Sequence, residues 1–397
     1  KGEEYKDFSK DITNEIKNEA RAIKKIKGKI LFTGGRTFSS SNLINRYEIS
    51  ENNVSSSSVK EIKKEYNFKK IKNIFQDIEK LRILIIGEII IDKYVFCEAL
   101  GKSGKEPVLV LRDRKTEEYL GGAAAIARHI SNFNNNITLF SMIGAKSEHL
   151  KKIKKNLPNK IKLDLLKKKK STTILKTRFV DSNSHNKVLG VYNFNDEILD
   201  KNQEKIQTQK LKKILPKFDL VIVSDYGHGF ISKSIAKLIC KKSKFLALNA
   251  QINASNIGYH SMRNYKNLDC VIINQKELEM EFRDRSSDLR NLIKKLSKIN
   301  NIDNLIVTQG RQGATFFDRK KNKFLQSDAF AKRVIDKVGA GDAFLSLTSL
   351  ILNLKKVNKK LALLIGSLAA AQSTEDIGNK NPVNKTTLLK HLEHILK

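Results

Sequence analysis

Short apolar runs alternate with helical segments over most of this 397-residue chain. The runs that could form buried strands lie at residues 81–87, 137–143, 220–224, 245–248, 270–273 and 305–308. Between them the apolar residues follow a helical period, for example over residues 232–242 and 287–299. Short buried strands that alternate with helices are typical of a parallel sheet covered by helices on both faces. The sequence therefore predicts an α/β fold with a doubly wound, mostly parallel sheet, which binds its ligands at the carboxyl ends of the strands.

Two stretches break this alternation, at residues 94–120 and 172–194, and both are interpreted as β-rich excursions. We expect them to form a small second sheet that covers the binding site as a β lid. A lid of this kind excludes water from the site beneath it.

Shifts in composition divide the chain into three predicted parts. Residues 1–50 form one unit, in which a short strand is expected over residues 29–33. Residues 51–80 begin with a serine-rich stretch and continue as a charged helix over residues 59–80, so we interpret them as a linker and connecting helix. Residues 81–397 contain the alternating strands and helices and form the main domain.

The charge balance is strongly positive, with 76 Lys and Arg residues against 42 Asp and Glu residues and a net charge of +34. The lysines are spread over nearly every segment, and no aromatic RNA-binding motif, zinc finger or arginine-rich tract accompanies them. The densest cluster, residues 167–170, is expected to lie in a loop. We therefore interpret the charge as solvated surface, and not as a nucleic-acid interface. A nucleic-acid-binding protein would instead show tight binding with a steep salt dependence.

The 3 cysteines, Cys97, Cys240 and Cys270, form neither a CxxC pair nor a metal-ligand cluster. Reduced, widely spaced thiols are typical of a cytoplasmic protein. No apolar run reaches the roughly 20 residues of a membrane-spanning helix. The chain begins at Lys1 and not at methionine, which is consistent with a longer natural chain.

A glycine-rich turn, Asp336-Lys337-Val338-Gly339-Ala340-Gly341-Asp342, precedes an apolar helix expected to run to about residue 354. The small residues Gly339, Ala340 and Gly341 leave backbone amides open to an anion, which the positive end of the helix dipole also attracts. Asp342 stands where a carboxylate could take a proton from a hydroxyl that attacks a phosphate. The pattern therefore predicts phosphoryl transfer, and an ordinary helix cap is the alternative.

This motif, with others upstream, resembles those of the PfkB (ribokinase-like) carbohydrate kinases and, within them, the heptose-7-phosphate kinases. Residues 336–342 match the signature D-x-x-G-A-G-D, and residues 121–127, G-G-A-A-A-I-A, resemble the signature G-G-A-x-N-x-A. The resemblance covers residues 81–397 and implies a ribokinase-like fold. It also implies an enzyme that transfers the γ-phosphate of ATP to a sugar hydroxyl with the help of Mg²⁺. In that reaction Asp342 would be the base, and the amides of residues 339–341 would stabilise the transferring phosphate.

The resemblance also implies which residues bind the sugar. Gly121 and Gly122 would let it approach the backbone, and Asp92, in the opening segment G-E-I-I-I-D, would accept hydrogen bonds from its hydroxyls. Asp225, in the segment S-D-Y-G-H-G, would face the sugar or the metal. His228 of that segment is a further candidate for a phosphate contact, although a structural histidine is the alternative.

Two segments of the predicted lid carry further resemblances, the first to the heptose kinases and the second to the family as a whole. Glu106 lies in the segment G-K-S-G-K-E-P-V, which resembles R-x-S-P-E-x-P-V and is assigned to substrate binding. Lys102 and Lys105 of the same segment could meet a substrate phosphate. Arg178 ends a K-x-R pattern and could clamp a phosphate with two hydrogen bonds.

The nucleotide side is implied by two further motifs. Asn274 and Glu277 match N-x-x-E, which would organise Mg²⁺ through water, since Mg²⁺ keeps several waters and binds few carboxylates. A plain helix-terminal glutamate is the alternative. Thr308, Gly310 and Gly313 lie in V-T-Q-G-R-Q-G, which resembles V-T-x-G-x-x-G, and would line the ATP together with Asn274.

Two departures leave the substrate open. Ala125 stands where the family normally has an asparagine that contacts sugar hydroxyls, and Asn249 stands where relatives often carry aspartate. A heptose phosphate is the favoured substrate, in the synthesis of a nucleotide-activated sugar. Another sugar or nucleoside is the first alternative, and a non-catalytic sugar- or nucleotide-binding regulator on the same fold is the second.

The first part of the chain resembles a different family. Residues 1–5, K-G-E-E-Y, and residues 38–42, F-S-S-S-N, resemble the last part of cytidylyltransferase-type nucleotidyltransferases. The H-x-G-H motif of those enzymes is absent, so residues 1–50 are expected to be catalytically inert by themselves. They would be the tail of a natural fusion, or point to a partner nucleotidyltransferase. We further expect a homodimer with no membrane contact.

Overall fold

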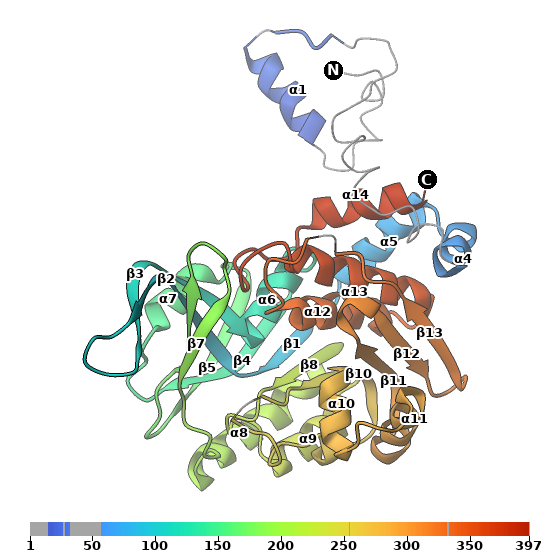
Figure 1. The fold of residues 1–397 in the computed structure, drawn as a ribbon. Helices are drawn as coiled ribbons and strands as arrows, with labels where there is room; N and C mark the ends of the chain where they lie inside the picture. The colour runs from blue at the N-terminus through green and yellow to red at the C-terminus, as the bar shows by residue number, and fades with distance from the viewer. Residues whose placement is uncertain (1–14, 27, 32–56, 254, 332, 397) are drawn as a thin grey trace. The chain divides into compact units, whose positions relative to one another are not determined.

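The computed structural model describes residues 15–26, 28–31, 57–253, 255–331 and 333–396 (Figure 1). The chain divides into two compact units, one of residues 1–71 with 384–397 and the other of residues 72–383. The larger unit contains both sheets and all the candidate site residues.

A nine-stranded sheet forms the centre of the larger unit, in the order β13-β12-β11-β10-β9-β8-β1-β4-β5 among the described residues. Every neighbouring pair from β11 to β5 is parallel, whereas β12 and β13 add an antiparallel edge. The strands are β1 (Ile83–Gly87), β4 (Ile137–Gly144), β5 (Ile161–Lys168), β8 (Leu220–Asp225), β9 (Leu246–Ala250), β10 (Leu268–Asn274), β11 (Ile302–Thr308), β12 (Ala314–Asp318) and β13 (Lys323–Ser327). Each apolar run expected to form a strand does so, which confirms the predicted α/β class.

Helices cover both faces of this sheet. In Figure 1, α6, α12 and α13 lie on one side of it, and α8, α9, α10 and α11 lie on the other. The helices are α6 (Ala123–Ser131), α7 (Leu150–Asn156), α8 (Lys201–Ile214), α9 (Lys233–Lys242), α10 (Gln275–Phe282), α11 (Leu289–Asn300), α12 (Ala340–Asn353) and α13 (Lys359–Ser373), with short 3₁₀ turns at Leu215–Lys217, Met262–Asn264 and Gly310–Gln312. The doubly wound arrangement is therefore confirmed. Helix α12 is buried along nearly its whole length because it packs against α6, α13 and the sheet.

The two β-rich excursions form a separate four-stranded sheet in the order β3-β2-β6-β7, here called the lid sheet. Its strands are β2 (Ile89–Lys102), β3 (Leu109–Gly122), β6 (Ile174–Asp181) and β7 (Lys187–Asn193). Strands β2 and β6 are parallel, and the two outer pairs are antiparallel. Strand β2 follows β1 after one residue, so the lid sheet is connected directly to the carboxyl edge of the main sheet (Figure 1).

The sequence predicted a loop for the lysine cluster at residues 167–170, and only part of the cluster forms one. Lys167 and Lys168 end β5, and only the next two residues form a turn. The Lys168 side chain is buried, and its Nζ donates to the carbonyls of Asn195 at 2.6 Å and His228 at 3.1 Å. This lysine therefore holds two segments together, whereas a solvated lysine would not.

The smaller unit contains α1 (Glu15–Lys25), α4 (Ser57–Glu65) and α14 (Lys385–Leu396), and α4 contacts α14. Helix α5 (Phe68–Glu79) crosses the boundary between the units. The single helix expected over residues 59–80 was wrong, because Asn67 breaks it and caps α5 by accepting from the Lys70 amide at 2.9 Å. The strand expected over residues 29–33 is absent at residues 29–31. The motifs at residues 1–5 and 38–42 lie outside the described residues.

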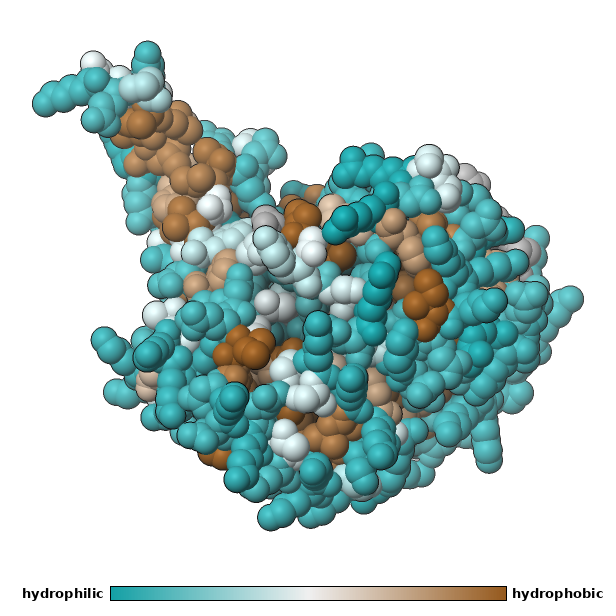
Figure 2. Space-filling model, turned by 90° about the horizontal axis from the view of Figure 1, so that it is seen from below, coloured by the Kyte–Doolittle hydropathy of each residue, from teal (hydrophilic) through white to brown (hydrophobic). Residues whose placement is uncertain are grey.

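The exposed side chains include scattered apolar residues. Figure 2 shows one face, on which hydrophilic side chains predominate and hydrophobic ones form separate patches. Among the helices that the structure describes, each is too short or too polar to traverse a bilayer.

Candidate active site

The signature turn lies where α12 begins. Gly339 is the N-cap of α12 and has a φ of 90°, in the left-handed region that glycine favours. A Cβ atom on Gly339 would lie 2.0 Å from Oδ1 of Asn379, so a larger residue would displace that side chain. The first turn of a helix leaves backbone amides without intrahelical acceptors, and the helix dipole adds partial positive charge there. This turn can therefore receive an anion.

Asp342 lies in that first turn, partly buried, and accepts a hydrogen bond of 3.0 Å from the Tyr226 hydroxyl. Burial raises the pKa of the Asp342 carboxyl to about 7. The Tyr226 hydrogen bond lowers this pKa, the negative charge of Asp92 raises it, and the Lys176 ammonium lowers it. A carboxyl group with a pKa near neutrality can accept a proton at little cost, which suits a general base.

One face of the lid sheet carries a set of charged groups. Asp92 of β2 pairs with Lys176 of β6, and Tyr94 pairs with Arg178. Because side chains alternate along a strand, these four share one face with Tyr192 of β7, which pairs with Lys176. Arg178 forms an ion pair with Asp92, and its guanidinium lies 5.5 Å from the centre of the Tyr94 ring. Two sequence-predicted residues, Asp92 and Arg178, are thus in direct contact.

Lys176 is the least satisfied charge on this face. It is 7% exposed, and its side chain makes no hydrogen bond or ion pair with any residue that the structure describes. Its Nζ lies 5.5 Å from the Tyr226 ring centre and 5.6 Å from that of Tyr192. Burial lowers the pKa of Lys176, and the nearby Asp92 opposes that shift. Since burying an unpaired ammonium is costly, this position favours an anionic ligand beside it.

Gly121 and Gly122 make room for this arrangement at the end of β3. A Cβ atom on Gly121 would lie 2.1 Å from Oδ2 of Asp92. Gly122 has a φ of 60°, and a Cβ atom there would lie 2.3 Å from the carbonyl oxygen of Glu88. Both glycines therefore permit a close approach to the residues of the site, with α6 starting directly after them.

Asp225, at the end of β8, is bound on both carboxylate oxygens by the protein itself. Oδ1 accepts from the Gly227 amide at 3.0 Å, and Oδ2 accepts from the Tyr265 hydroxyl at 2.6 Å. Nε2 of His260 lies 3.7 Å from Oδ2. The carboxylate is buried, so these contacts give it a structural task whether or not it also meets a ligand.

Glu88, which joins β1 to β2, is a buried carboxyl group that the sequence did not single out. It accepts hydrogen bonds from the amides of Tyr226 at 3.0 Å and His228 at 3.1 Å. Burial raises the pKa of Glu88 to about 7, and the charge of Asp225 adds to the shift. His228 is fully buried with Nδ1 2.7 Å from Oδ1 of Asp196, and burial lowers its pKa to about 4. These contacts match the structural alternative for His228.

Asn274 and Glu277 form a reciprocal capping box at the start of α10. Asn274 Oδ1 accepts from the Glu277 amide at 2.9 Å, and Glu277 Oε2 accepts from the Asn274 amide at 2.8 Å. Burial raises the pKa of Glu277 to about 7, against the effect of the nearby backbone amides, and the charge of Asp342 contributes to the rise. The Glu277 and Asp342 carboxyls are therefore close enough to repel each other.

Thr308, Gly310 and Gly313 lie in the turn between β11 and β12. Gly310 and Gly313 have φ values of 59° and 82°, so the turn depends on both glycines. The space beside Gly310 is open, whereas a Cβ atom on Gly313 would lie 1.9 Å from the carbonyl oxygen of Ser327. The Thr308 hydroxyl donates to the Ile273 carbonyl at 3.4 Å, which joins this turn to the strand that leads to Asn274.

Glu106 is not brought to the other candidates. It lies with Lys105 in the exposed turn between β2 and β3, just after Lys102 at the end of β2, and its side chain contacts no other candidate among the described residues. Of the two departures, Ala125 is buried in α6, and Asn249 is the penultimate residue of β9, with its Nδ2 donating to the Ile272 carbonyl at 2.7 Å. Asn249 thus tethers two strands of the main sheet.

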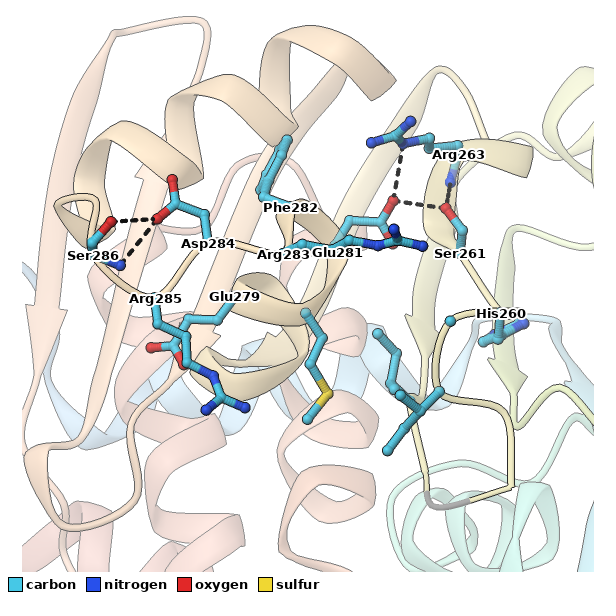
Figure 3. A pocket seen from close by; sticks show the side chains of 14 residues that line it. His260, Ser261, Arg263, Glu279, Glu281, Phe282, Arg283, Asp284, Arg285 and Ser286 are labelled. Carbon is cyan, nitrogen blue, oxygen red and sulfur yellow. Dashed lines mark hydrogen bonds and ion pairs between the residues drawn. The ribbon is translucent and has the colours of Figure 1, made fainter.

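A cavity of about 1030 Å³ lies next to the site, between the segment after β9 and the C-terminal part of α10 (Figure 3). Arg263, which lines it, forms an ion pair with Glu281 at 3.4 Å, and Ser261 donates to the same carboxylate at 2.7 Å. His260 lies at its edge and connects it to Asp225. None of the sequence-predicted site residues is among those that line this cavity.

Sequence reasoning missed several residues of the site. Lys176 and Tyr226 lay inside recognised patterns but were not assigned roles, and Glu88 was passed over as part of an opening motif. Tyr94 and Lys187 gave no signal, because the first is one of 9 tyrosines and the second stands among 76 basic residues. Tyr94 and Lys187 both contact Asp336, which lies far from them in the sequence.

The comparison with known families decides what this geometry belongs to. The family model described as "pfkB family carbohydrate kinase" matches residues 80–386 of this chain. This chain belongs to the pfkB family. A pfkB kinase of this kind phosphorylates a carbohydrate, and the turn that carries Asp342 is inside the matched region. The predicted family is therefore confirmed.

Curated relatives and solved structures agree with that assignment. The chain is 26% identical over 293 residues to the bifunctional protein HldE of Desulfatibacillum aliphaticivorans, covering 72% of the chain and 58% of the relative. It is 28% identical over 307 residues to HldE of Campylobacter curvus, covering 76% and 63%. The chain thus spans about three fifths of the length of these relatives.

The fold is that of solved ribokinase-like kinases. Phosphofructokinase-2 from Escherichia coli, solved in complex with potassium, superposes with a TM-score of 0.62 at 16% identity, covering 80% of this chain and 100% of that one. Ribokinase from Arabidopsis thaliana, solved with ribose and ATP, has a TM-score of 0.56 at 16% identity, covering 80% and 99%. The predicted ribokinase-like fold is confirmed.

Proposed function

We propose that this kinase transfers the γ-phosphoryl group of ATP to a hydroxyl of a sugar that already carries a phosphate, and that this sugar is a heptose phosphate. The observation that carries the proposal is the pair of cations on the inner face of the lid sheet. Lys176 is buried with no ion-pair partner among the residues that the structure describes, and Arg178 lies on the same face two residues further along β6. A phosphate on the sugar would give Lys176 a direct ion pair in addition to the charge of the nearby Asp92, whereas an unphosphorylated sugar would not.

In the proposed reaction Asp342 takes the proton of the attacking hydroxyl, and that oxygen attacks the γ-phosphorus in line with the leaving ADP. Gly339, Ala340 and Gly341 present backbone amides to the charge that develops on the transferring group. Asp92 and the backbone at Gly121 and Gly122 orient the sugar. Asp225 supports the segment that carries Tyr226, and Tyr226 holds the Asp342 carboxyl in place.

Nucleotide and metal are proposed to lie on the other side of Asp342. The turn with Thr308, Gly310 and Gly313 would line the ATP phosphates. The Glu277 and Asp342 carboxyls, whose pKa values are both raised to about 7, are the kind of acidic pair that a divalent cation relieves. When bound, Mg²⁺ would neutralise charge on the ATP phosphates. Asn274 and Glu277 fit contacts to its bound waters, because an amide and a carboxylate at the start of α10 can both meet coordinated water.

The double substitution Asn274→Ala with Glu277→Gln should raise the Mg²⁺ concentration for half-maximal rate by about tenfold. The sugar KM should rise by less. Both groups act near the metal and not on the acceptor. The measurement is initial rate against free Mg²⁺ at saturating ATP. Asp288→Ala, which removes the N-cap of α11 outside the site, controls for loss of a helix cap. An unchanged Mg²⁺ requirement with a weakened sugar KM would mean that these residues bind sugar.

The heptose assignment rests on the resemblance of the lid and signature segments to heptose-7-phosphate kinases and on relatives named bifunctional. We propose that the product enters synthesis of a nucleotide-activated, ADP- or CDP-linked sugar. Residues 1–50 would then be the tail of a fused nucleotidyltransferase, or the chain would act with such a partner. The free thiols of Cys97, Cys240 and Cys270 are consistent with the proposed cytoplasmic location.

The proposed division places residues 81–397 as the kinase and residues 1–50 outside its chemistry. A chain that begins at residue 57 keeps α4, which contacts α14, and should phosphorylate the same sugar within about twofold of the full-length rate. Rate and molecular mass would be measured together. A shortened chain that stays folded and monodisperse but loses activity would show that residues 1–56 contribute to the kinase site.

A panel of sugars and sugar phosphates, read by ADP release, tests the function itself. Turnover with a heptose phosphate and little with the free sugar is expected. Turnover with a hexose or nucleoside instead would favour the alternative that Ala125 and Asn249 leave open. ATP binding without turnover on any substrate would favour a regulator.

We also propose that the lid sheet joins two copies of the chain. Leu189 and Val191 of β7 lie on the face opposite to Lys176 and are 54% and 52% exposed. A second copy is a natural partner for such an apolar sheet face, because it would remove the same residues of both chains from water. Light scattering of the protein, and of a Leu189→Glu variant, would decide between dimer and monomer.

A further inference from the structure

Asp336, the first residue of the signature turn, is a buried junction of four hydrogen bonds. It is 6% exposed. Its Oδ1 accepts from Lys187 Nζ at 2.5 Å and from the Val338 amide at 3.1 Å. Its Oδ2 accepts from the Tyr94 hydroxyl at 2.8 Å and from the Gly378 amide at 3.1 Å. The carboxylate is therefore fully used by donors from this chain.

These donors come from three separate parts of the larger unit. Tyr94 and Lys187 belong to the lid strands β2 and β7, and Val338 directly precedes Gly339 of the signature turn. Gly378 lies in the loop after α13, where a φ of 57° and a Cβ position 3.0 Å from the Tyr94 ring admit only glycine without movement. A single carboxylate thus joins the lid sheet to the turn that starts α12.

Tyr94 extends this junction toward the sugar side of the site. Its ring lies 5.5 Å from the Arg178 guanidinium, and Arg178 is paired with Asp92. The contacts therefore run without a gap from the signature turn, through Asp336 and Tyr94, to the residues proposed to meet the acceptor. These contacts can hold the signature turn and the acceptor residues in place only while the lid sheet stays in contact with Asp336.

Lys187 is the part of the junction most able to open. All residues of β7 are exposed, so little besides its pairing with β6 holds this edge strand. The Lys187 side chain itself is 40% exposed, whereas Asp336 is buried. The ion pair therefore fastens a weakly held strand to a buried and fixed point.

We propose that Lys187 is a positioning residue that latches the lid sheet to the signature turn and so excludes water while the phosphoryl group is transferred. The role in transfer rests on the proposed function, whereas the latch itself does not. With the latch open, water could attack the γ-phosphorus in place of the sugar hydroxyl. The bond to ADP would break and the products would be ADP and inorganic phosphate.

Hydrogen–deuterium exchange of the full chain tests the latch, with Lys187→Met as the variant. We expect amide exchange in residues 187–193 and 336–341 to become about fivefold faster or more, since a partly buried charge pair is lost. Lys187→Arg should restore protection, because it keeps the charge. Lys115→Met is the matched control, as Lys115 pairs with Glu117 on the far edge strand of the same sheet. Unchanged exchange at residues 336–341 in Lys187→Met would overturn the latch.

Partition of ATP between water and sugar tests water exclusion. In Lys187→Met the ratio of ADP formed without sugar to ADP formed with saturating sugar should rise severalfold. The kcat for sugar phosphorylation should fall by a larger factor than the factor by which the KM for ATP rises. Lys187→Arg should return the ratio toward the wild-type value, and Lys115→Met should not change it. Faster exchange with an unchanged ratio would overturn the water-exclusion role. A normal transfer rate in Asp342→Asn would place the error in the proposed function instead.

Discussion

Replacing Asp342 with asparagine should lower the rate of phosphoryl transfer by about a thousandfold or more, while the Kd for ATP changes little. Asparagine keeps the size of the side chain and can still meet the Tyr226 hydroxyl, but it cannot take a proton from the sugar. Transfer would be measured by ADP release at saturating sugar, and binding by calorimetry. Near-normal turnover would remove Asp342 from the chemistry and leave the signature turn as a helix cap.

The unfolding stability of Asp342→Asn and a matched control variant show whether its loss of activity comes from unfolding. Burial raises the Asp342 pKa from 3.8 to about 7, so the folded state holds this proton more tightly than the unfolded chain. That contribution to stability is complete below pH 3.8 and is lost as pH rises through 7. Asp342→Asn should therefore unfold no more easily than the wild type at alkaline pH. Asp164→Asn, on the edge strand β5, should retain activity.

The same carboxyl group should set the pH dependence of kcat/KM. The base must be ionised, so kcat/KM should rise with pH through a midpoint of about 7 and then level off. The hydrogen bond from Tyr226 lowers the Asp342 pKa, so Tyr226→Phe should move the midpoint to higher pH. Glu88 and Glu277 also have pKa values of about 7, and only a midpoint that responds to Tyr226→Phe belongs to Asp342.

The central strands could be predicted because they are buried on both faces. A parallel strand such as β1 or β8 is covered by helices above and below, so its sequence is continuously apolar. Strand β5 lies at the edge of the sheet and reads I-K-L-D-L-L-K-K, with lysine at both ends of the apolar stretch. Strands β12 and β13 form an edge hairpin with an exposed outer strand. Partial exposure of β5 and β13 removed the signal that identified the others, whereas β12 is buried along its whole length and was still not singled out.

The residues of the site also fall into those that the sequence could predict and those that it could not. Asn274 with Glu277, and Gly339 to Asp342, are groups whose members are neighbours in sequence, so local spacing was enough to predict them. The contacts of Asp336 with Tyr94 and Lys187 span 242 and 149 residues. Their formation depends on strand register, which one sequence does not reveal. Glu106 is the opposite case, since a segment match assigned it to substrate binding, whereas it lies in an exposed turn away from the other candidates.

Replacing Lys176 with methionine should reduce kcat/KM for a phosphorylated sugar by about a hundredfold, and that for the same sugar without phosphate much less. Removing one partner of a buried charge pair typically has an effect of this size. Lys176 is the cleaner choice than Arg178, because Arg178 also pairs with Asp92, whereas Lys176 has no ion-pair partner among the described residues. Methionine keeps the unbranched apolar stem between the Tyr192 and Tyr226 rings. The two kcat/KM values would be measured for each variant with matched sugars.

Two further effects of Lys176 must be separated from a phosphate contact. Its ammonium lowers the Asp342 pKa, so its loss should raise that pKa and slow transfer near neutrality. Full pH profiles of both proteins, compared on the plateau where Asp342 is ionised and Lys176 still carries its proton, isolate the contact with substrate. Lys93→Met, next to Asp92 but on the opposite face of β2, should leave both values nearly unchanged. An equal loss for sugar and sugar phosphate at high pH would show that Lys176 orients the acceptor or the γ-phosphate. The preference for a phosphorylated substrate would then have to come from other residues.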